Sequence, residues 1–483
     1  MPTRRLLIWL LSLFACFYLA TGLIGSLHRP QVVGRLELYQ SNLVLEASAW
    51  QAPEWQQPLL QALDAKASTR KDLNRLITQV EQTLADQNRP LSGGDRQSQT
   101  DLLDQLRLSL GLLEASDGQV DRALELWTTV QSDTGTDTAT GRLASILSGL
   151  WSTPAQLQPQ AQSEISRGLR GWYRDQALDR LFSLQGLEGD RQRLGEQGQR
   201  QAESALVGLG LLSATPVVGS IVGLGVLGRW GWQRWREREQ PSPPDWSVPW
   251  DGDSIAQVML VGFVLIGQVL VNQTLFPLGI SLLGVNRADL GVVGQSALIL
   301  VLYGVMAAVT LGFSALSLRP YRPWPSGWFQ IRPDRSALVQ GLGGYLAAVP
   351  LVIGSSLISQ QIWQGEGGSN PILELALAQN SNLALLLFWL TAAIAAPLFE
   401  ELLFRGFLLP SLTRYVSRPA AIGLSAAFFA IAHLSLAELL PLFVLGCVLG
   451  TVYTRSRNLA SSMLLHALWN SGTLASLVIL GRL

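Results

Sequence analysis

Six side chains with acid–base or hydrogen-bonding chemistry lie in the apolar C-terminal part of this 483-residue sequence: Glu400, Glu401, Arg405, His433, His466 and Asn470. An ionisable group inside a bilayer is energetically unfavourable, so such residues within membrane segments mark candidate functional sites. Carboxylates and imidazoles exchange protons, and a carboxamide donates hydrogen bonds. The set indicates a functional site. Two alternatives are a proton relay for transport and an interhelical hydrogen-bond network that only packs helices.

The spacing of these residues fits helices. Glu401 precedes Arg405 by four residues, which is the favourable orientation for an ion pair on one helix face. Adjacent helix residues point about 100° apart, so we expect Glu400 to face other surroundings, a polar cavity, and the two glutamates to have different tasks. His466 and Asn470 are also four residues apart, and they share one face of the last apolar run.

The depths expected for these side chains in a bilayer agree with one another. With a rise of ~1.5 Å per residue, Glu400 and Asn470 each lie roughly 18 Å from the inner ends of their helices. The same rise places His433 about 22 Å and His466 about 12 Å from the inner ends of theirs. Because the hydrocarbon core is about 30 Å thick, all four groups can meet in one layer near its midplane.

Nine apolar runs can supply the helices that hold these residues, since about 20 apolar residues span the hydrocarbon core. The runs are 6–27, 205–228, 254–283, 291–316, 337–358, 382–411, 420–434, 438–453 and 459–481. The short pair 420–434 and 438–453 forms either two spans or one hairpin that dips through the core. The first run lacks a clear cleavage site, so we expect an uncleaved anchor.

The distribution of basic residues predicts the orientation of these spans. With the N-terminus in the cytoplasm, fourteen arginines fall in inside segments, whereas the short outside loops and the tail hold only Arg287 and Arg482. Cytoplasmic loops are the ones enriched in basic residues. We therefore expect a cytoplasmic N-terminus and a non-cytoplasmic location for residues 29–204.

The composition excludes several classes of protein. Only 14% of the residues are charged and 48% are hydrophobic, with 35 basic residues balancing 35 acidic ones. A soluble domain carries about a quarter charged residues, so the chain is neither wholly soluble nor disordered. The balanced charge also argues against a nucleic-acid partner. Cys16 and Cys447 lie in apolar runs and form no disulfide framework.

The fold class predicted is all-α: a polytopic membrane protein with about nine transmembrane helices and an N-terminal helical extramembrane domain. We expect four parts: an anchor, the extramembrane domain, a second span with a basic linker, and a C-terminal membrane domain, over 1–28, 29–204, 205–253 and 254–483. In the second part, Leu110, Gly111, Ala123 and Trp127 have the spacing of one tetratricopeptide-like helical hairpin. Such a domain either binds a protein partner or packs as a plain helical bundle.

Three motifs on successive spans carry a family resemblance. They are Glu400-Glu401-x-x-x-Arg405, Phe429-x-x-x-His433 and His466-x-x-x-Asn470. In this order they resemble the motifs of the CPBP family, formerly called Abi proteins, which comprises CAAX prenyl proteases and bacteriocin-processing enzymes. The resemblance covers roughly residues 254–483. It implies an intramembrane endopeptidase, a hydrolase acting on a membrane-associated peptide or protein.

The resemblance also implies roles for single residues. Glu400 would activate a water molecule with help from His433, and His466 and Asn470 would stabilise the oxyanion of the tetrahedral intermediate. Zinc bound by Glu400, His433 and His466 is an alternative, but no HExxH motif is present, so we favour a mechanism without a cofactor.

The remaining motif residues have supporting roles in this interpretation. Glu401 and Arg405 would form a structural ion pair beside the site, and Phe429 would be either ordinary packing or a wall of the cavity. The rival hypothesis is a membrane scaffold or immunity protein that uses the same network for packing. Nothing in the sequence selects a substrate or shows whether that substrate is prenylated.

Overall fold

A computed structural model describes residues 2–27, 29–31, 33–51, 64–86, 93–236, 246–286, 289–369 and 381–482. Helices are the only regular elements in these ranges, which confirms the all-α class. The chain forms two compact units. Unit 1 comprises Met1–Arg29 and Thr215–Val478, and unit 2 comprises Pro30–Ala214 with Ile479–Leu483.

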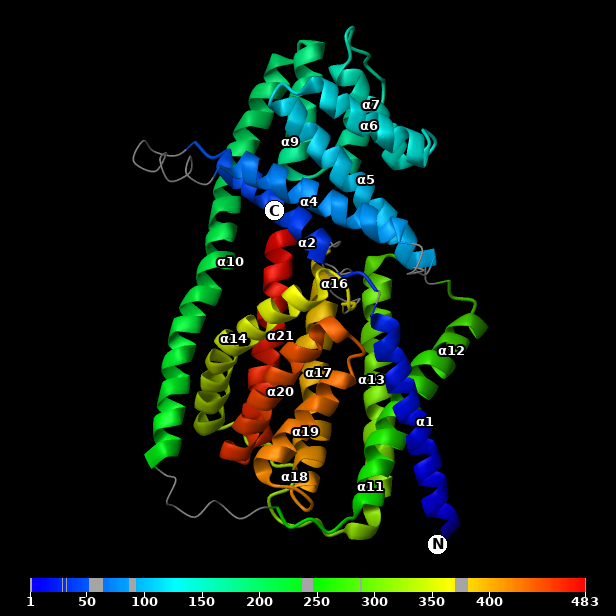
Figure 1. The fold of residues 1–483 in the computed structure, drawn as a ribbon, viewed down its shortest axis with the longest axis vertical. Helices are drawn as coiled ribbons and strands as arrows, with labels where there is room; N and C mark the ends of the chain where they lie inside the picture. The colour runs from blue at the N-terminus through cyan, green and yellow to red at the C-terminus, as the bar shows by residue number, and fades with distance from the viewer. Residues whose placement is uncertain are drawn as a thin grey trace. The chain divides into compact units, whose positions relative to one another are not determined.

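The helices of unit 1 follow the apolar runs of the sequence (Figure 1). They are α1 (Pro2–Ser26), the second half of α10 (Glu188–Arg236), α11 (Gly252–Ala256), η1 (Gln257–Leu275), α12 (Phe276–Leu282), α13 (Val292–Ser317), η2 (Arg319–Tyr321), α14 (Arg335–Trp363), α16 (Asn382–Trp389), η3 (Leu390–Ala395), α17 (Ala396–Glu400), η4 (Glu401–Leu408), α18 (Leu409–Leu412), α19 (Arg418–Ile431), α20 (Leu436–Ser456) and α21 (Leu459–Arg482).

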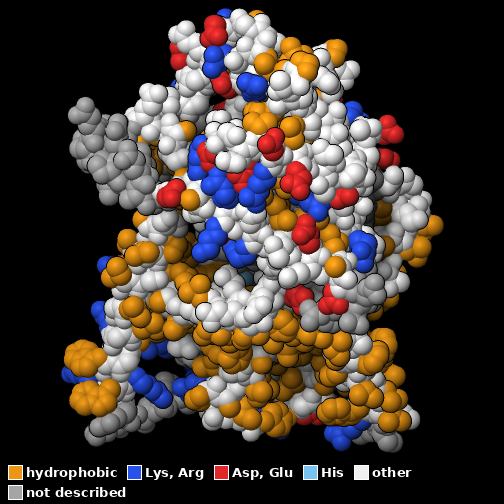
Figure 2. All heavy atoms as spheres, turned by 45° about the horizontal axis from the view of Figure 1, so that its top comes forward, with side chains coloured by type: hydrophobic (Ala, Val, Ile, Leu, Met, Phe, Trp, Pro, Cys, Tyr) orange, Lys and Arg blue, Asp and Glu red, His pale blue; other side chains and the backbone are white. Residues whose placement is uncertain are grey.

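Eight continuous helical stretches in the described residues are long and apolar enough to cross a membrane. The ninth apolar run corresponds to α19, which has only 14 residues and is followed by a turn into α20. Large apolar side chains remain exposed on the outer faces of the spans, for example Leu13 at 69% and Ile221 at 66%. Figure 2 shows hydrophobic side chains covering much of the visible surface of unit 1. The protein is an integral, multi-pass membrane protein.

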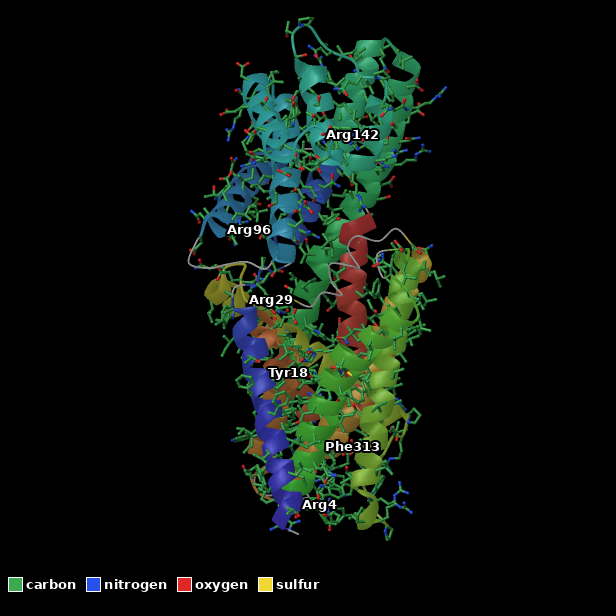
Figure 3. All side chains as sticks on the ribbon, turned by 90° about the vertical axis from the view of Figure 1, so that its right-hand side faces the viewer. Arg4, Tyr18, Arg29, Arg96, Arg142 and Phe313 are labelled. Atoms are coloured by element: carbon green, nitrogen blue, oxygen red, sulfur yellow. The ribbon has the colours of Figure 1, made fainter. Side chains whose placement is uncertain are left out.

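The N-terminal helix α1 packs within unit 1, beside η1 (Figure 3). Arg5 forms an ion pair with Asp253 at 2.7 Å near one end of α1, and Gln273 donates a hydrogen bond of 2.6 Å to the Tyr18 hydroxyl. Ala15 on the same helix is fully buried. The predicted anchor is thus joined by specific contacts to the membrane helices that follow it in sequence.

Unit 2 is built from consecutive helices that pack on one apolar core. They are α2 (Val33–Ser48), α4 (Ala65–Ala85), α5 (Gly93–Ser116), α6 (Val120–Thr134), α7 (Ala139–Trp151), α8 (Ala161–Gly168), α9 (Gly171–Gln185) and the first half of α10. Neighbours in sequence are mostly neighbours in space, with α5 on α6 and α6 on α7. The long α10 belongs to both units, so the boundary expected near residue 204 falls inside a helix.

The four residues of the tetratricopeptide-like pattern lie on α5 and α6 of unit 2, which pack against each other. A Cβ atom on Gly111 would lie 2.3 Å from Nε1 of Trp127, so only glycine fits at this crossing. The Trp127 indole is fully buried and donates to the backbone oxygen of Leu108 at 3.3 Å. Leu110 and Ala123, the other two residues of the pattern, are buried as well.

Candidate active site

The helix that bears both glutamates alternates between α-helical and π-helical segments. The segments η3 and η4 flank the short α17, and Glu400 is its last residue. π-Helical turns widen the backbone and are frequent at functional sites, because they change the direction of successive side chains. Pro397 is the second residue of α17 and has no backbone N–H, so one intrahelical hydrogen bond is missing just before the glutamates.

Glu401 and Arg405 form the predicted ion pair across one turn of η4. Nη1 of Arg405 lies 2.8 Å from Oε1 of Glu401, and the two side chains are 1% and 0% exposed. Arg405 also donates to the backbone oxygen of Gly446 on α20 at 3.2 Å and lies 4.6 Å from the centre of the Phe429 ring. A buried ion pair is stable only with such additional contacts. Through them the pair links η4 to α20 and α19.

His466 on α21 lies between the two glutamates. Its Nδ1 is 3.0 Å from Oε1 of Glu401, and its Nε2 is 3.9 Å from Oε2 of Glu400. An ionised Glu401 accepts the Nδ1–H bond and so fixes the orientation of the ring, which leaves Nε2 facing Glu400. The two carboxylates have different main partners, as expected, but both also lie beside the same imidazole, one near each ring nitrogen.

Glu400 has a partner that the sequence motifs did not reveal. Tyr303 on α13 donates a hydrogen bond of 2.9 Å to Oε1 of Glu400, and its ring packs edge-on against Phe399 at 6.0 Å between centroids. The Glu400 side chain is 15% exposed, whereas Glu401 is completely buried. Of the two carboxylates, Glu400 is thus the more exposed one.

His433 lies in the turn between α19 and α20, not on the helix as its spacing from Phe429 indicated. The helix ends at Ile431, and Leu434 takes a left-handed conformation with φ of 54°. Nδ1 of His433 is 2.7 Å from the backbone oxygen of Phe429, which fixes Nδ1 as the protonated nitrogen and leaves Nε2 as an acceptor.

Phe429 joins the two imidazoles. Its ring centroid lies 4.8 Å from that of His433 and 5.8 Å from that of His466, both edge-on, and its side chain is fully buried. This residue forms a wall between the second and third motifs, with Arg405 on its other side.

Asn470 lies one turn beyond His466 on α21. Its Nδ2 donates a hydrogen bond of 2.6 Å to the backbone oxygen of Ala392 in η3. This carbonyl belongs to the π-helical segment η3, so the hydrogen bond links α21 to the helix that bears the glutamates. The amide retains a second N–H for another acceptor.

The three motifs therefore meet around His466. Glu400, Glu401 and Phe429 contact its ring, Arg405 pairs with Glu401, and His433 is joined through Phe429. The zinc alternative requires three ligands that converge on one point. Within the described ranges, no group of three His, Cys, Asp or Glu side chains is placed to hold a metal ion.

Comparison with known proteins agrees with these motifs. Residues 382–472 match the family model described as Rce1-like, type II CAAX prenyl endopeptidase Rce1-like, and this segment contains all three motifs. The match covers less than a quarter of the chain. No curated protein and no solved structure matches the chain. Over residues 382–472, the part of the membrane region that holds the three motifs, the chain is thus similar to the type II CAAX prenyl endopeptidases.

Proposed function

We propose that this protein is an intramembrane endopeptidase that hydrolyses a peptide bond of a membrane-associated substrate with Glu400 as general base. The observation that carries the proposal is the state of the Glu400 carboxylate. It is accessible, held by Tyr303 on one oxygen and turned toward His466 with the other. It also lies inside the segment that matches a protease family.

The proposed reaction begins with water near Glu400. Glu400 takes a proton from the water while the water oxygen attacks the carbonyl carbon of the substrate. Nε2 of His433 accepts a hydrogen bond from the same water molecule. The C–N bond then breaks, and the proton passes from Glu400 to the leaving amine. Each step uses only residues of this chain and one water molecule.

The negative charge of the intermediate is stabilised by the other two motif residues. Asn470 donates its second N–H to the oxyanion, and His466 donates from Nε2. The latter role requires a proton on both nitrogens of His466, because Nδ1 already donates to Glu401. The resulting imidazolium carries a charge opposite to that of the oxyanion, which strengthens the interaction in a water-poor site.

The family description suggests which substrate class to test first. Type II CAAX prenyl endopeptidases give the first class to test, a peptide that ends in a prenylated CAAX sequence. A prenyl group would also anchor such a peptide in the bilayer beside the exposed apolar faces of unit 1.

The proposal is tested by comparing membrane-protein fragments from cells that express the wild type, Glu400→Gln or Glu438→Gln. The last variant is a matched control at the start of α20. We expect fragments that appear with the wild type and the control and are lost with Glu400→Gln at equal protein levels. Fragment patterns that are the same for all three proteins would contradict the proposal.

A scaffold or immunity protein is the second candidate. The buried contacts of Glu401, Arg405 and His466 favour it, because these three side chains join α20, α21 and η4 without any ligand. A scaffold would keep its biological effect in the Glu400→Gln variant.

A zinc enzyme would lose cleavage on treatment with a chelator. For this protein we expect the rate of peptide cleavage to stay unchanged when the chelator is added.

A further inference from the structure

Tyr303 is a polar residue in an otherwise strongly apolar span. The helix α13 that carries it, Val292–Ser317, contains no charged side chain. The hydroxyl of Tyr303 nevertheless points at one of the few carboxylates in unit 1, donating to Oε1 of Glu400 at 2.9 Å. A hydrogen bond to an ionised acceptor is roughly twice as strong as one between neutral groups, so this contact is a strong restraint on Glu400.

The ring of Tyr303 is itself held in place. It packs edge-on against Phe399, the residue just before Glu400, with centroids 6.0 Å apart. Phe399 is 2% exposed and also packs on Phe263 of η1. The hydroxyl therefore reaches Glu400 from a ring whose position is fixed by packing, which limits the rotamers open to the carboxylate.

The two oxygens of Glu400 are thereby made unequal. Tyr303 occupies Oε1, while Oε2 is 3.9 Å from Nε2 of His466, a separation too long for a direct hydrogen bond. Oε2 thus keeps its lone pairs for a third partner between the carboxylate and the imidazole. A water molecule bridging the two groups is the kind of partner such a separation admits.

The partner of Glu400 also differs in charge from that of Glu401. Glu401 is bound to the cationic Arg405, whereas Glu400 is bound to a neutral phenol. The Tyr303 hydrogen bond therefore orients the Glu400 carboxylate without forming a direct ion pair with it.

We propose that Tyr303 is a positioning residue that holds Oε1 of Glu400 so that Oε2 takes the proton from the attacking water. This inference rests on the proposed function. It predicts an effect on the chemical step and none on substrate binding, because Tyr303 acts through Glu400.

The test is the Tyr303→Phe variant, which keeps the ring and removes the hydroxyl. The purified full chain is reconstituted in phosphatidylcholine vesicles with an internally quenched peptide that ends in a farnesylated CAAX sequence. We expect kcat to fall about tenfold, the factor that corresponds to about 1.4 kcal/mol at 25 °C, with KM within about twofold of the wild type.

Tyr321→Phe is the matched control. The Tyr321 hydroxyl makes a hydrogen bond of the same 2.9 Å length, but with the neutral hydroxyl of Ser254. The loss of any buried tyrosine hydroxyl could lower the amount of folded protein, and this variant measures that effect. We expect its kcat to equal that of the wild type.

A double-variant cycle with Glu400→Gln tests the contact without any substrate. If the hydrogen bond is present, the fall in unfolding midpoint for Tyr303→Phe is smaller in the Glu400→Gln background than in the wild type. Independent shifts would overturn the inference, as would a wild-type kcat for Tyr303→Phe beside an inactive Glu400→Gln. Failure of the wild type to cleave the peptide, or full activity of Glu400→Gln, would contradict the proposed function, and the cycle would still test the contact.

Discussion

Removing the positive charge of Arg405 should be among the most destabilising single changes in unit 1. Arg405→Met keeps an apolar side chain of similar length but leaves the carboxylate of Glu401, which is 0% exposed, without its cation. Breaking a buried ion pair from one side costs about 3–5 kcal/mol, because the remaining carboxylate is not solvated and keeps only its hydrogen bond from His466. The hydrogen bond to the backbone oxygen of Gly446 is lost as well.

The double variant Glu401→Gln with Arg405→Met separates the buried charge from the lost contacts. The amide that replaces the Glu401 carboxylate still offers an oxygen to Nδ1 of His466 but carries no charge. We expect the double variant to regain about half of the stability lost by Arg405→Met, since only neutral contacts worth about 1–2 kcal/mol remain missing.

The assay is the midpoint of heat-induced aggregation in detergent, read by size-exclusion chromatography. A loss of about 3–5 kcal/mol corresponds to a fall of roughly 5–8 °C for the unfolding of a unit of the size of unit 1. Arg455→Met is the control, because Arg455 lies at the exposed end of α20, where it donates to the neutral Gln233 and lies over the Trp230 ring. A midpoint for Arg405→Met within about 2 °C of the wild type, or a double variant less stable than Arg405→Met, would refute the reasoning.

Three further predictions concern unit 2. Gly111→Ala forces a Cβ against the Trp127 indole and should lower stability by about 1–3 kcal/mol, checked by the same melting assay. No loss is expected for the control Gly195→Ala on α10, where nothing lies within 4 Å of the added Cβ. Burial raises the pKa of Glu46 to about 7, so its protonated form stabilises the fold below about pH 4.5 and this contribution is lost as the pH rises through 7. The stability of the wild type relative to Glu46→Gln should therefore fall between these two pH values. A difference that stays constant with pH would contradict the prediction. With the native cysteines replaced, Ser132→Cys should react with a membrane-impermeant maleimide in intact cells, and labelling only after lysis would reverse the proposed orientation.

The parts of the structure that depend on local sequence could be predicted. Apolar runs of sufficient length gave the spans, and the four-residue spacing of Glu401 and Arg405 gave an ion pair that the structure contains. Gly111 and Trp127 likewise marked a close helix crossing in α5 and α6. In each case the interacting groups lie on one helix or on two consecutive helices, where the geometry of a single turn or hairpin sets the distance.

The parts of the structure that depend on contacts between distant spans could not be predicted. Tyr303 reaches Glu400 across 97 residues of sequence, and its only signal was a hydroxyl in an apolar span. The apolar pattern continues to residue 434, so nothing indicated that α19 ends at Ile431 and leaves His433 in a turn. The π-helical segments were also missed, because hydrophobic periodicity does not distinguish them from α-helix over so few residues. The segment η3 precedes α17, which ends at Glu400, and η4 begins at Glu401, so both segments influence the directions in which the two side chains leave the helix.

The side-chain roles at the site remain a proposal that one measurement addresses most directly. Purified wild-type protein and Glu400→Gln are compared in vesicles for cleavage of the farnesylated peptide, with circular dichroism to verify equal helix content. We expect Glu400→Gln to be about a hundredfold to ten-thousandfold slower with an unchanged spectrum, the range typical for loss of a general base. A correctly folded Glu400→Gln that cleaves at a rate close to the wild type would contradict the role of Glu400 as the general base.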